Sequence, residues 1–409
     1  MATVVAAAAA GRLPPPDVLT VPEALEAIRA ASPAPRGTLE PLSPDLAGRV
    51  LLADVRATVS LPPFATSAMD GYAVRAAELG KAPLPVAFRI AAGDAPRALA
   101  PSTAAGIATG APVPEGADAV VPIEDAREDG GLIAEQPRVG AAIRPAGGDL
   151  RAGDVVAARG TVLRPAVLAA IAAAGVPEVE VASRPRIAIV ATGSELVRPG
   201  RPLAPGQIYE SNAIAVAAQA VRAGAEVAST ELVEDDAEAT RGAFARALAE
   251  AEVVVSSGGV SVGPHDYVKP ALEQLGVREV FWRVRHKPGK PLWFGAAQDG
   301  TLVFGLPGNP VSSVVCFELF VRAALEAMTG AEPAPRPVAR LAEPVSRLAE
   351  RDHAVRCTLE RGDEGMSLRP QTAQDSHLIA HAAAADAIAL IPAGSGEVAA
   401  GEPVEYVAL

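Results

Sequence analysis

Short apolar runs alternate with helical segments between residues 186 and 328, and this alternation constrains the fold more than any other feature of the sequence. Each run has the length of a buried strand. Strands that alternate with helices predict right-handed crossovers and a doubly wound parallel sheet. Ligands of such sheets bind at the carboxyl ends of the strands, so the turns that follow the runs are candidate binding loops. The predicted strands are Ile187–Ala191, Glu226–Thr230, Val253–Ser256 and Leu302–Gly305.

Residues that favour helix starts precede several of the helical segments. Serine, threonine, aspartate and asparagine cap helices by accepting hydrogen bonds from the first free N–H groups, and proline suits the first turn. An acidic residue three positions later completes a capping box. The predicted caps are Thr20 before Val21 and Pro22, Ser211 or Asn212 for a helix to Ala223, Asp235 with Glu238, and Asn309 for a helix from Pro310 to about Met328.

The rest of the chain predicts smaller domains around this α/β domain. A stretch rich in proline, glycine and short β-like runs lies between two mixed segments, as expected for a β domain inserted into a discontinuous one. A proline-rich linker precedes short strand-like runs at the C-terminal end. The predicted divisions are a flexible tail at 1–16, a discontinuous mixed domain at 17–60 and 148–182, an inserted β domain at 61–147, the α/β domain at 183–330 and a C-terminal β domain at 331–409.

Composition excludes two classes of partner. The 409 residues carry a formal net charge of −12 and only 3% aromatic residues, which disfavours a nucleic-acid surface. No stretch of about 18 apolar residues is present, and the apolar start of the chain lacks a basic signal region. The only cysteines, Cys316 and Cys357, form no disulfide framework or zinc motif. We therefore expect a cytoplasmic protein.

Two loops that follow predicted strands are suited to binding anions. Ser256–Gly263 contains three glycines that allow close backbone approach, and Gly305–Ser313 places Asn309 and Pro310 at a helix start. Free N–H groups in both loops can bind phosphate oxygens. The alternative is that the glycines serve only the geometry of a tight turn between strand and helix.

Three carboxylates follow strands at the same predicted edge of the sheet. Glu195, Asp236 and Asp266 can hold a hard cation such as Mg²⁺, which prefers oxygen ligands. Alternatively, Asp236 and Asp266 simply cap their helices.

Lysine is rare, which gives weight to the segment that contains two of the four lysines. Lys287 and Lys290 flank a Pro-Gly turn, and a compact ammonium group suits a small oxyanion. The alternative is a solvated run of charge. His377 and His381 have the spacing of a helical metal pair, but no third ligand accompanies them, which favours ordinary histidines.

Five motifs in order resemble the molybdopterin molybdenumtransferase family, that of MoeA and the gephyrin E domain. The resemblance runs from about Val21 to the C-terminus. The motifs are Ser67–Ala73, Thr109–Asp118, Ser256–Gly263, Lys287–Pro291 and Leu306–Val311.

This resemblance implies a four-domain subunit with a C-terminal β-barrel-like domain. It implies a homodimer whose cleft combines the α/β domain of one subunit with the inserted domain of the other. It also implies a Mg²⁺-dependent reaction in which molybdate is inserted into adenylylated molybdopterin and AMP is released. Molybdopterin adenylyltransferase or another protein of cofactor synthesis would deliver the intermediate.

The resemblance also assigns roles residue by residue. The catalytic positions are Asp70, Thr109, Asp149, Glu195, Asp236 and Asp266, of which the last three are expected to bind metal. The positions expected to bind substrate are Ser257, Gly258, Gly259, Ser261, Gly263, Pro307, Gly308, Asn309, Lys287, Lys290, Arg356 and Ser376.

The sequence departs from the family pattern at a few places. Ser194 stands where the family usually has aspartate, Pro264–His265 is an unusual pair, and Glu350 and Ala354 replace a typical glycine and aromatic residue near Arg356. A non-catalytic scaffold that binds molybdopterin, and the preceding adenylylation step, are the alternative functions. The sequence does not distinguish molybdate from tungstate.

Overall fold

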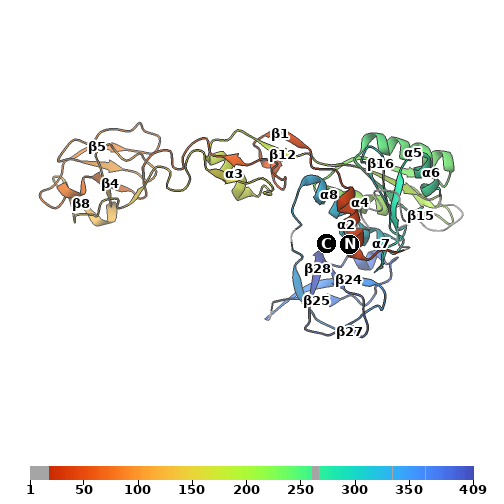
Figure 1. Ribbon diagram of the computed structural model, residues 1–409. Coiled ribbons are helices and arrows are strands. Elements are labelled where there is room, and N and C mark those ends of the chain that lie inside the picture. The colour runs from red at the N-terminus through yellow and green to blue at the C-terminus, as the bar shows by residue number, and fades with distance from the viewer. Residues whose placement is uncertain (1–17, 260–266, 334, 364) are drawn as a thin grey trace. The chain divides into compact units, whose positions relative to one another are not determined.

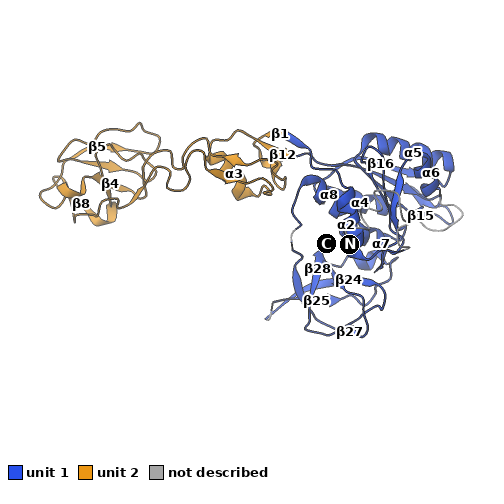
Figure 2. Ribbon diagram, viewed as in Figure 1, with its two compact units in different colours: residues 1–38, 182–409 blue, residues 39–181 orange. Residues whose placement is uncertain are grey.

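The computed structural model describes residues 18–259, 267–333, 335–363 and 365–409 (Figure 1). The chain divides into two compact units, Met1–Thr38 with Ala182–Leu409 (unit 1) and Leu39–Val181 (unit 2), which Figure 2 colours separately. The predicted tail at 1–16 and the candidate site residues Ser261, Gly263 and Asp266 lie outside the described residues. None of the helices in the described ranges has the length and apolar composition that crossing a bilayer requires.

Unit 1 contains the predicted α/β sheet. Its six strands lie in the order β16-β13-β17-β21-β20-β18. The first four strands are parallel, and β20 and β18 continue the sheet in the antiparallel direction. All four predicted strands are therefore confirmed. The strands are β13 (Arg186–Thr192), β16 (Glu226–Val233), β17 (Val253–Ser257), β18 (Arg278–Trp282), β20 (Trp293–Ala296) and β21 (Leu302–Leu306).

Helices cover both faces of this sheet because alternate strand residues point to opposite faces. Ile187 and Ile189 share one core with four helices, whereas Ala188 and Val190 share the other core with two. The first face carries α2 (Val21–Ala31), α4 (Asn212–Arg222), α7 (Pro310–Cys316) and α8 (Arg322–Thr329), and the second carries α5 (Ala237–Glu250) and α6 (Val268–Gln274).

Helix α2 begins at the predicted cap. The Thr20 side chain accepts a hydrogen bond from the Glu23 N–H, and the Glu23 carboxylate accepts one from the Thr20 N–H, which is the reciprocal capping box. The buried face of α2, which includes Leu25 and Ile28, packs in the core of unit 1. This helix thus packs with the α/β sheet, whereas the sequence predicts it as part of the discontinuous domain with residues 148–182.

The predicted helix from Pro310 to Met328 contains a wider turn. Between α7 and α8 the chain forms a π-helical turn, η4 (Phe317–Val321). The Gln219 side chain of α4 donates a hydrogen bond of 3.1 Å to the Val314 carbonyl just before this turn. An inserted polar group of this kind satisfies a backbone carbonyl where the helical pattern changes.

The C-terminal part of unit 1 is a closed barrel, as expected. Strands lie in the order β19-β24-β25-β22-β28-β26, and an additional pairing of β24 with β26 closes the ring. Closure removes free sheet edges. The strands are β19 (His286–Lys287), β22 (Val338–Leu341), β24 (Asp352–Gly362), β25 (Gly365–Pro370), β26 (Ala387–Ile391) and β28 (Pro403–Ala408), with β23 (Val345–Ser346) and β27 (Glu397–Val398) paired beside them and the short helix α9 (Ile379–Ala382) before β26.

Unit 2 contains a four-stranded sheet in the order β5-β6-β4-β7 and several two-stranded pairs. Leu51 and Val55, which precede this sheet in the chain, share one core with Leu163 and Ile171, which follow it. The division of the chain into four domains stays a prediction. The elements are β1 (Gly37–Pro41), β2 (Val55–Arg56), β3 (Thr66–Ser67), β4 (Gly71–Val74), β5 (Val86–Ile90), β6 (Ala104–Ile107), β7 (Ala119–Pro122), β8 (Ala126–Glu128), β9 (Leu132–Ala134), β10 (Ile143–Arg144), β11 (Val155–Ala157), α3 (Pro165–Ala173) and β12 (Glu178–Ala182).

Candidate active site

Three turns meet at the carboxyl edge of the parallel sheet. They follow β13, β17 and β21, which are neighbours in the sheet. The Gly258 N–H donates a hydrogen bond of 3.2 Å to the Leu306 carbonyl, and a Cβ placed on Gly308 would lie 3.9 Å from the Gly258 Cα. The two loops predicted to bind anions are therefore in contact.

Asn212 joins these two loops. Its Nδ2 donates a hydrogen bond of 2.8 Å to the Ser257 Oγ and another of 2.8 Å to the Gly308 carbonyl. Neither Ser211 nor Asn212 caps α4 with its side chain; instead the buried Glu210 carboxylate accepts a hydrogen bond of 2.6 Å from the Ala213 N–H. The sequence pattern identified Asn212 only as a cap, because its partners lie far along the chain.

The first two glycines of the first loop are required by its geometry. Gly258 and Gly259 have φ of 90° and 67°, and a Cβ on Gly259 would lie 2.3 Å from the Val268 side chain. Thr192, at the end of β13, is buried beside both glycines, and its hydroxyl has no hydrogen-bond partner among the residues that the structure describes. A buried hydroxyl without a partner beside a binding loop is a candidate donor to a ligand.

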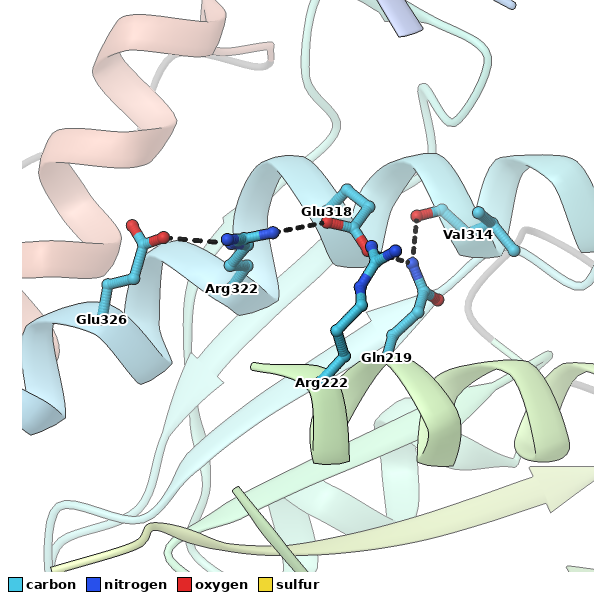
Figure 3. A network of polar contacts seen from close by, with 6 residues as sticks. All are labelled: Gln219, Arg222, Val314, Glu318, Arg322 and Glu326. Atoms are coloured by element: carbon cyan, nitrogen blue, oxygen red, sulfur yellow. Dashed lines mark hydrogen bonds and ion pairs between the residues drawn. The ribbon is translucent and has the colours of Figure 1, made fainter. Parts of the chain in front are cut away.

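Figure 3 shows a charged network that links α4 to the helical run starting at the second loop. The buried Glu318 carboxylate forms ion pairs with Arg222 of α4 and with Arg322 of α8, and it accepts a hydrogen bond of 2.8 Å from Gln219. Arg322 also pairs with Glu326 at 3.0 Å. The network connects α4, which begins at Asn212, to the helical run that follows Asn309.

The predicted metal-binding carboxylates differ in their surroundings. Glu195 and Asp236 are exposed, and Asp236 Oδ1 accepts a hydrogen bond of 2.8 Å from the Ala239 N–H, which makes Asp236 the N-cap of α5. The capping box predicted at Asp235 is therefore wrong, because α5 begins one residue later. Asp266, the third predicted ligand, lies outside the described residues. Within those residues, no three His, Cys, Asp or Glu side chains are grouped as a metal site.

Asp235 instead joins the turn after β13. The Ser194 N–H donates to the Asp235 carboxylate, and the Asp235 N–H donates to the Ser194 hydroxyl, both at 3.1 Å. These reciprocal bonds connect the loop of Glu195 with the loop of Asp236. Ser194 stands where an aspartate was expected, and its hydroxyl accepts the hydrogen bond from Asp235, so the departure maintains the contact between these loops.

Both lysines of the basic turn are exposed, and the residues between them are buried. Lys287 and Lys290 flank Pro288 and Gly289, so the ammonium groups face solvent while the turn is packed inside. Strand β19 pairs with β24 and places Lys287 opposite His353. Burial, together with the charge of Lys287, lowers the pKa of His353 to about 4.

Arg356, expected to bind the oxyanion, is buried in β24. Its guanidinium donates to the carbonyls of Ala373, Gln374 and Asp375 and to the Gln371 side chain. Burial lowers the pKa of Arg356 from its usual value. In this structure Arg356 organises the loop that precedes Ser376, and its predicted contact with the oxyanion stays a prediction.

Ser376 lies beside the second anion loop. Its hydroxyl accepts a hydrogen bond of 2.9 Å from Asn309 Nδ2, and its carbonyl accepts one of 3.1 Å from the Val311 N–H. Asn309 occupies the N-cap position of α7 without bonding to the helix through its side chain. The structure thus joins Asn309 and Ser376, a contact that the sequence did not predict.

The remaining candidates lie in unit 2. Asp70 and Thr109 are exposed and directly connected, because the Asp70 carboxylate accepts a hydrogen bond of 2.7 Å from the Thr109 N–H. Asp149 is also exposed, and its N–H donates to the Leu61 carbonyl at 2.9 Å. The Asp70 and Thr109 loops therefore form one local structure within this unit.

Three family profiles match consecutive parts of the chain. They are the MoeA N-terminal region (domain I and II) at residues 19–175, the probable molybdopterin binding domain at 188–327 and the MoeA C-terminal region (domain IV) at 338–409. The molybdopterin molybdenumtransferase 2 of Mycobacterium tuberculosis is 42% identical over 304 residues, which span 71% of this chain and 75% of the relative.

The chain belongs to the molybdopterin molybdenumtransferase (MoeA) family.

Other MoeA relatives match over most of their length. The molybdopterin molybdenumtransferase of Haemophilus influenzae is 34% identical over 371 residues, covering 88% of this chain and 91% of the relative. A crystal structure of the molybdopterin biosynthesis MoeA protein of Pyrococcus horikoshii aligns with a TM-score of 0.79 at 31% identity, over 96% of this chain and 99% of the other. The multidomain MoeA fold is thereby confirmed.

Proposed function

We propose that this chain inserts molybdate into adenylylated molybdopterin and releases AMP, forming the molybdenum cofactor. The observation that carries the proposal is the contact between the two anion-binding loops, which Asn212 joins at the carboxyl edge of the sheet. Ser376 reaches the second loop from the barrel, and β19 brings the exposed Lys287 to the same barrel. The relatives named molybdopterin molybdenumtransferase support the same reaction.

The described groups divide into two binding roles. The N–H groups of Gly259, Gly308 and Asn309, for which the described residues show no acceptor, and the Ser257 hydroxyl would hold the phosphates of the pterin substrate. Lys287 and Lys290 would hold the molybdate dianion, because two compact ammonium groups match a small tetrahedral oxyanion. Holding both substrates at one edge converts their encounter into a reaction within a complex.

Mg²⁺ fits the exposed carboxylates of Glu195 and Asp236. This cation binds through one or two carboxylates, substrate phosphate oxygens and water, so a closed cage of protein ligands is not needed. Asp236 keeps one carboxylate oxygen that no described hydrogen bond uses, and Asp266 is the proposed third ligand. Bound Mg²⁺ would neutralise phosphate charge where the AMP leaving group departs.

The proposal extends to assembly and location. A homodimer would bring Asp70, Thr109 and Asp149 of one subunit to the α/β domain of the other, as the family resemblance implies. We propose a cytoplasmic enzyme that receives its substrate from molybdopterin adenylyltransferase or another protein of cofactor synthesis.

The test is AMP release from adenylylated molybdopterin with and without molybdate. We expect molybdate-dependent release by the unchanged chain, with a loss of at least about tenfold for Asp266→Asn and Lys287→Ala. Lys81→Ala is the matched control, since Lys81 is an exposed lysine of unit 2, and it should keep the full rate.

Three outcomes would contradict the proposal. Unchanged rates in both active-site variants would remove the assigned roles. Binding of the pterin without turnover would indicate a scaffold. Formation of adenylylated molybdopterin from ATP would indicate the preceding step.

A further inference from the structure

The turn between Lys287 and Lys290 is packed against two buried side chains that the proposed reaction does not use. Gly289 has φ of 106°, and a Cβ added there would lie 2.4 Å from the Cys316 Sγ and 2.7 Å from the His286 Cε1. Gly289 is therefore in direct contact with both residues, and no larger residue fits this space without displacing one of them.

Hydrogen bonds fix the same contact. The Cys316 thiol donates to the Gly289 carbonyl at 3.7 Å, a carbonyl that also accepts a bond of 3.2 Å from the Leu292 N–H. The His286 Nε2 lies 3.8 Å from the Cys316 Sγ, and its ring lies 5.2 Å from that of Phe320.

Neither residue can bind the oxyanion itself. His286 is 1% exposed and Cys316 is 0% exposed, so neither reaches solvent beside the lysines. Burial lowers the pKa of His286 to about 4, against the opposing effect of the Gly289 carbonyl, so this ring is neutral at pH 7. Burial raises the pKa of the Cys316 thiol, which excludes a thiolate. Two neutral side chains thus support a turn that carries two cations.

Cys316 also connects the lysine turn to the second anion loop. It is the last residue of α7, whose first residue follows Asn309. A seven-residue helix is about 10 Å long and rigid on this scale, so it sets the distance between the loop at its start and the turn at its end.

We propose that Cys316 and His286 are positioning residues: they form a seat for Gly289 that fixes Lys287 and Lys290 relative to the second anion loop, and this seat sets the affinity for the small oxyanion. The inference rests on the proposed function, because it assumes that the lysines bind molybdate. The inference is testable without turnover, because binding of molybdate alone reports on the two lysines.

The experiment compares two equivalent deletions in the full chain. Cys316→Ala removes the sulfur beneath Gly289, and Cys357→Ala removes the other fully buried cysteine, which lies in the barrel core. Both variants should lose a similar amount of thermal stability. Only Cys316→Ala should raise the KM for molybdate, by about tenfold with little change in kcat, below the ~100-fold that a 1 Å misplacement can cost. Cys316→Ser, which keeps a donor to the Gly289 carbonyl, should restore most of the affinity.

A second readout does not depend on turnover. The chain has only four lysines, so acetylation of each can be followed by mass spectrometry. Molybdate alone should protect Lys287 and Lys290 in the unchanged chain and in Cys357→Ala, and protect them several-fold less in Cys316→Ala, with Lys81 as the internal reference. If this pattern of protection is found but no AMP is released, the positioning role of Cys316 is supported and the proposed reaction is contradicted.

The seat is overturned by any of three results. One is an equal effect of Cys316→Ala and Cys357→Ala on the KM and on protection. Another is failure of Cys316→Ser to differ from Cys316→Ala. The third is an absence of molybdate protection in the unchanged chain, since the turn then holds no oxyanion.

Discussion

The Asp70 carboxylate accepts a 2.7 Å hydrogen bond from the backbone N–H of Thr109, and this bond joins two loops of unit 2 that lie 39 residues apart. Both residues belong to motifs of the MoeA resemblance. Asp70 therefore holds the Thr109 loop as well as presenting a carboxylate.

Replacement of Asp70 should separate these effects. Asp70→Ala removes the charge and the loop contact, and we expect AMP release to fall by about tenfold or more. Asp94 is the matched control, because its carboxylate accepts a 2.8 Å bond from the Ala91 N–H in another exposed loop of the same unit. Asp94→Ala should lower the melting temperature similarly and keep the rate; equal losses of rate would assign Asp70 a structural role only.

Asp236 is expected to act both as a helix cap and as a metal ligand. Asp236→Ala should lower the free energy of unfolding by about 1 kcal/mol, because the Ala239 N–H loses its partner. Asp236→Asn keeps the cap and removes the charge, so stability should remain while the Mg²⁺ concentration needed for half-maximal AMP release rises. Denaturant unfolding and Mg²⁺ titrations check the two effects, and an unchanged Mg²⁺ requirement in Asp236→Asn would exclude the metal role.

Glu318 is the buried centre of the network in Figure 3, and its loss should be costly. Glu318→Ala leaves the Gln219 amide and two half-exposed guanidinium groups without their shared acceptor, so we expect a loss of about 2–4 kcal/mol in stability. Glu326→Ala removes only the outer partner of Arg322 and should cost less than about 1 kcal/mol. Calorimetric melting of both variants tests this order. A loss of stability in Glu326→Ala as large as that in Glu318→Ala would contradict it.

His286 should make stability depend on pH. Burial lowers its pKa in the folded chain to about 4 from an ordinary value of 6.5, so the unfolded chain binds its proton first as pH falls. The contribution of the neutral ring is complete above pH 6.5 and is lost between pH 6.5 and 4, a change of about 3 kcal/mol. His286→Phe should reduce the slope of the stability profile in this window, and the remaining slope should come from His353, whose pKa is also lowered to about 4. Parallel profiles for His286→Phe and the unchanged chain would contradict the prediction.

Thr192 tests whether an unpartnered hydroxyl serves the substrate. Thr192→Val keeps the shape and removes a buried donor that has no partner in the described part of the chain, so stability should change by less than about 1 kcal/mol or rise. If the hydroxyl contacts the pterin substrate, the KM for that substrate should rise several-fold. An unchanged KM, measured by AMP release, would assign Thr192 to packing alone.

The sequence predicted features that depend on neighbouring residues. The buried strands follow from their apolar runs, and the Thr20 cap follows from its own next three residues. The same reasoning predicted the wrong cap for α5, where two aspartates are adjacent. Either Asp235 or Asp236 could accept a hydrogen bond from the first N–H groups of the helix, and the backbone conformation determines that Asp236 does so.

Contacts between distant segments were beyond sequence reasoning. Asn212 bonds to groups 45 and 96 residues away, so nothing near it in the chain indicates its role. Arg356 was identified as a cation for an oxyanion, yet its nearest acceptors are carbonyls of a later loop, and backbone carbonyls leave no signal in a sequence. The support of Gly289 by Cys316 depends in the same way on a helix 27 residues further on.

The chain passes from unit 1 into unit 2 after Thr38 and returns after Val181. The Ser183 N–H donates a 2.8 Å hydrogen bond to the Arg36 carbonyl, and β1 pairs with β12, so the chain leaves unit 1 and returns to it at adjacent backbone positions. Residues 39–181 thus form an inserted segment whose two ends are close together. All strands of the two six-stranded sheets of unit 1 lie outside this range, so we expect a chain with a short loop in place of residues 39–181 to keep both sheets.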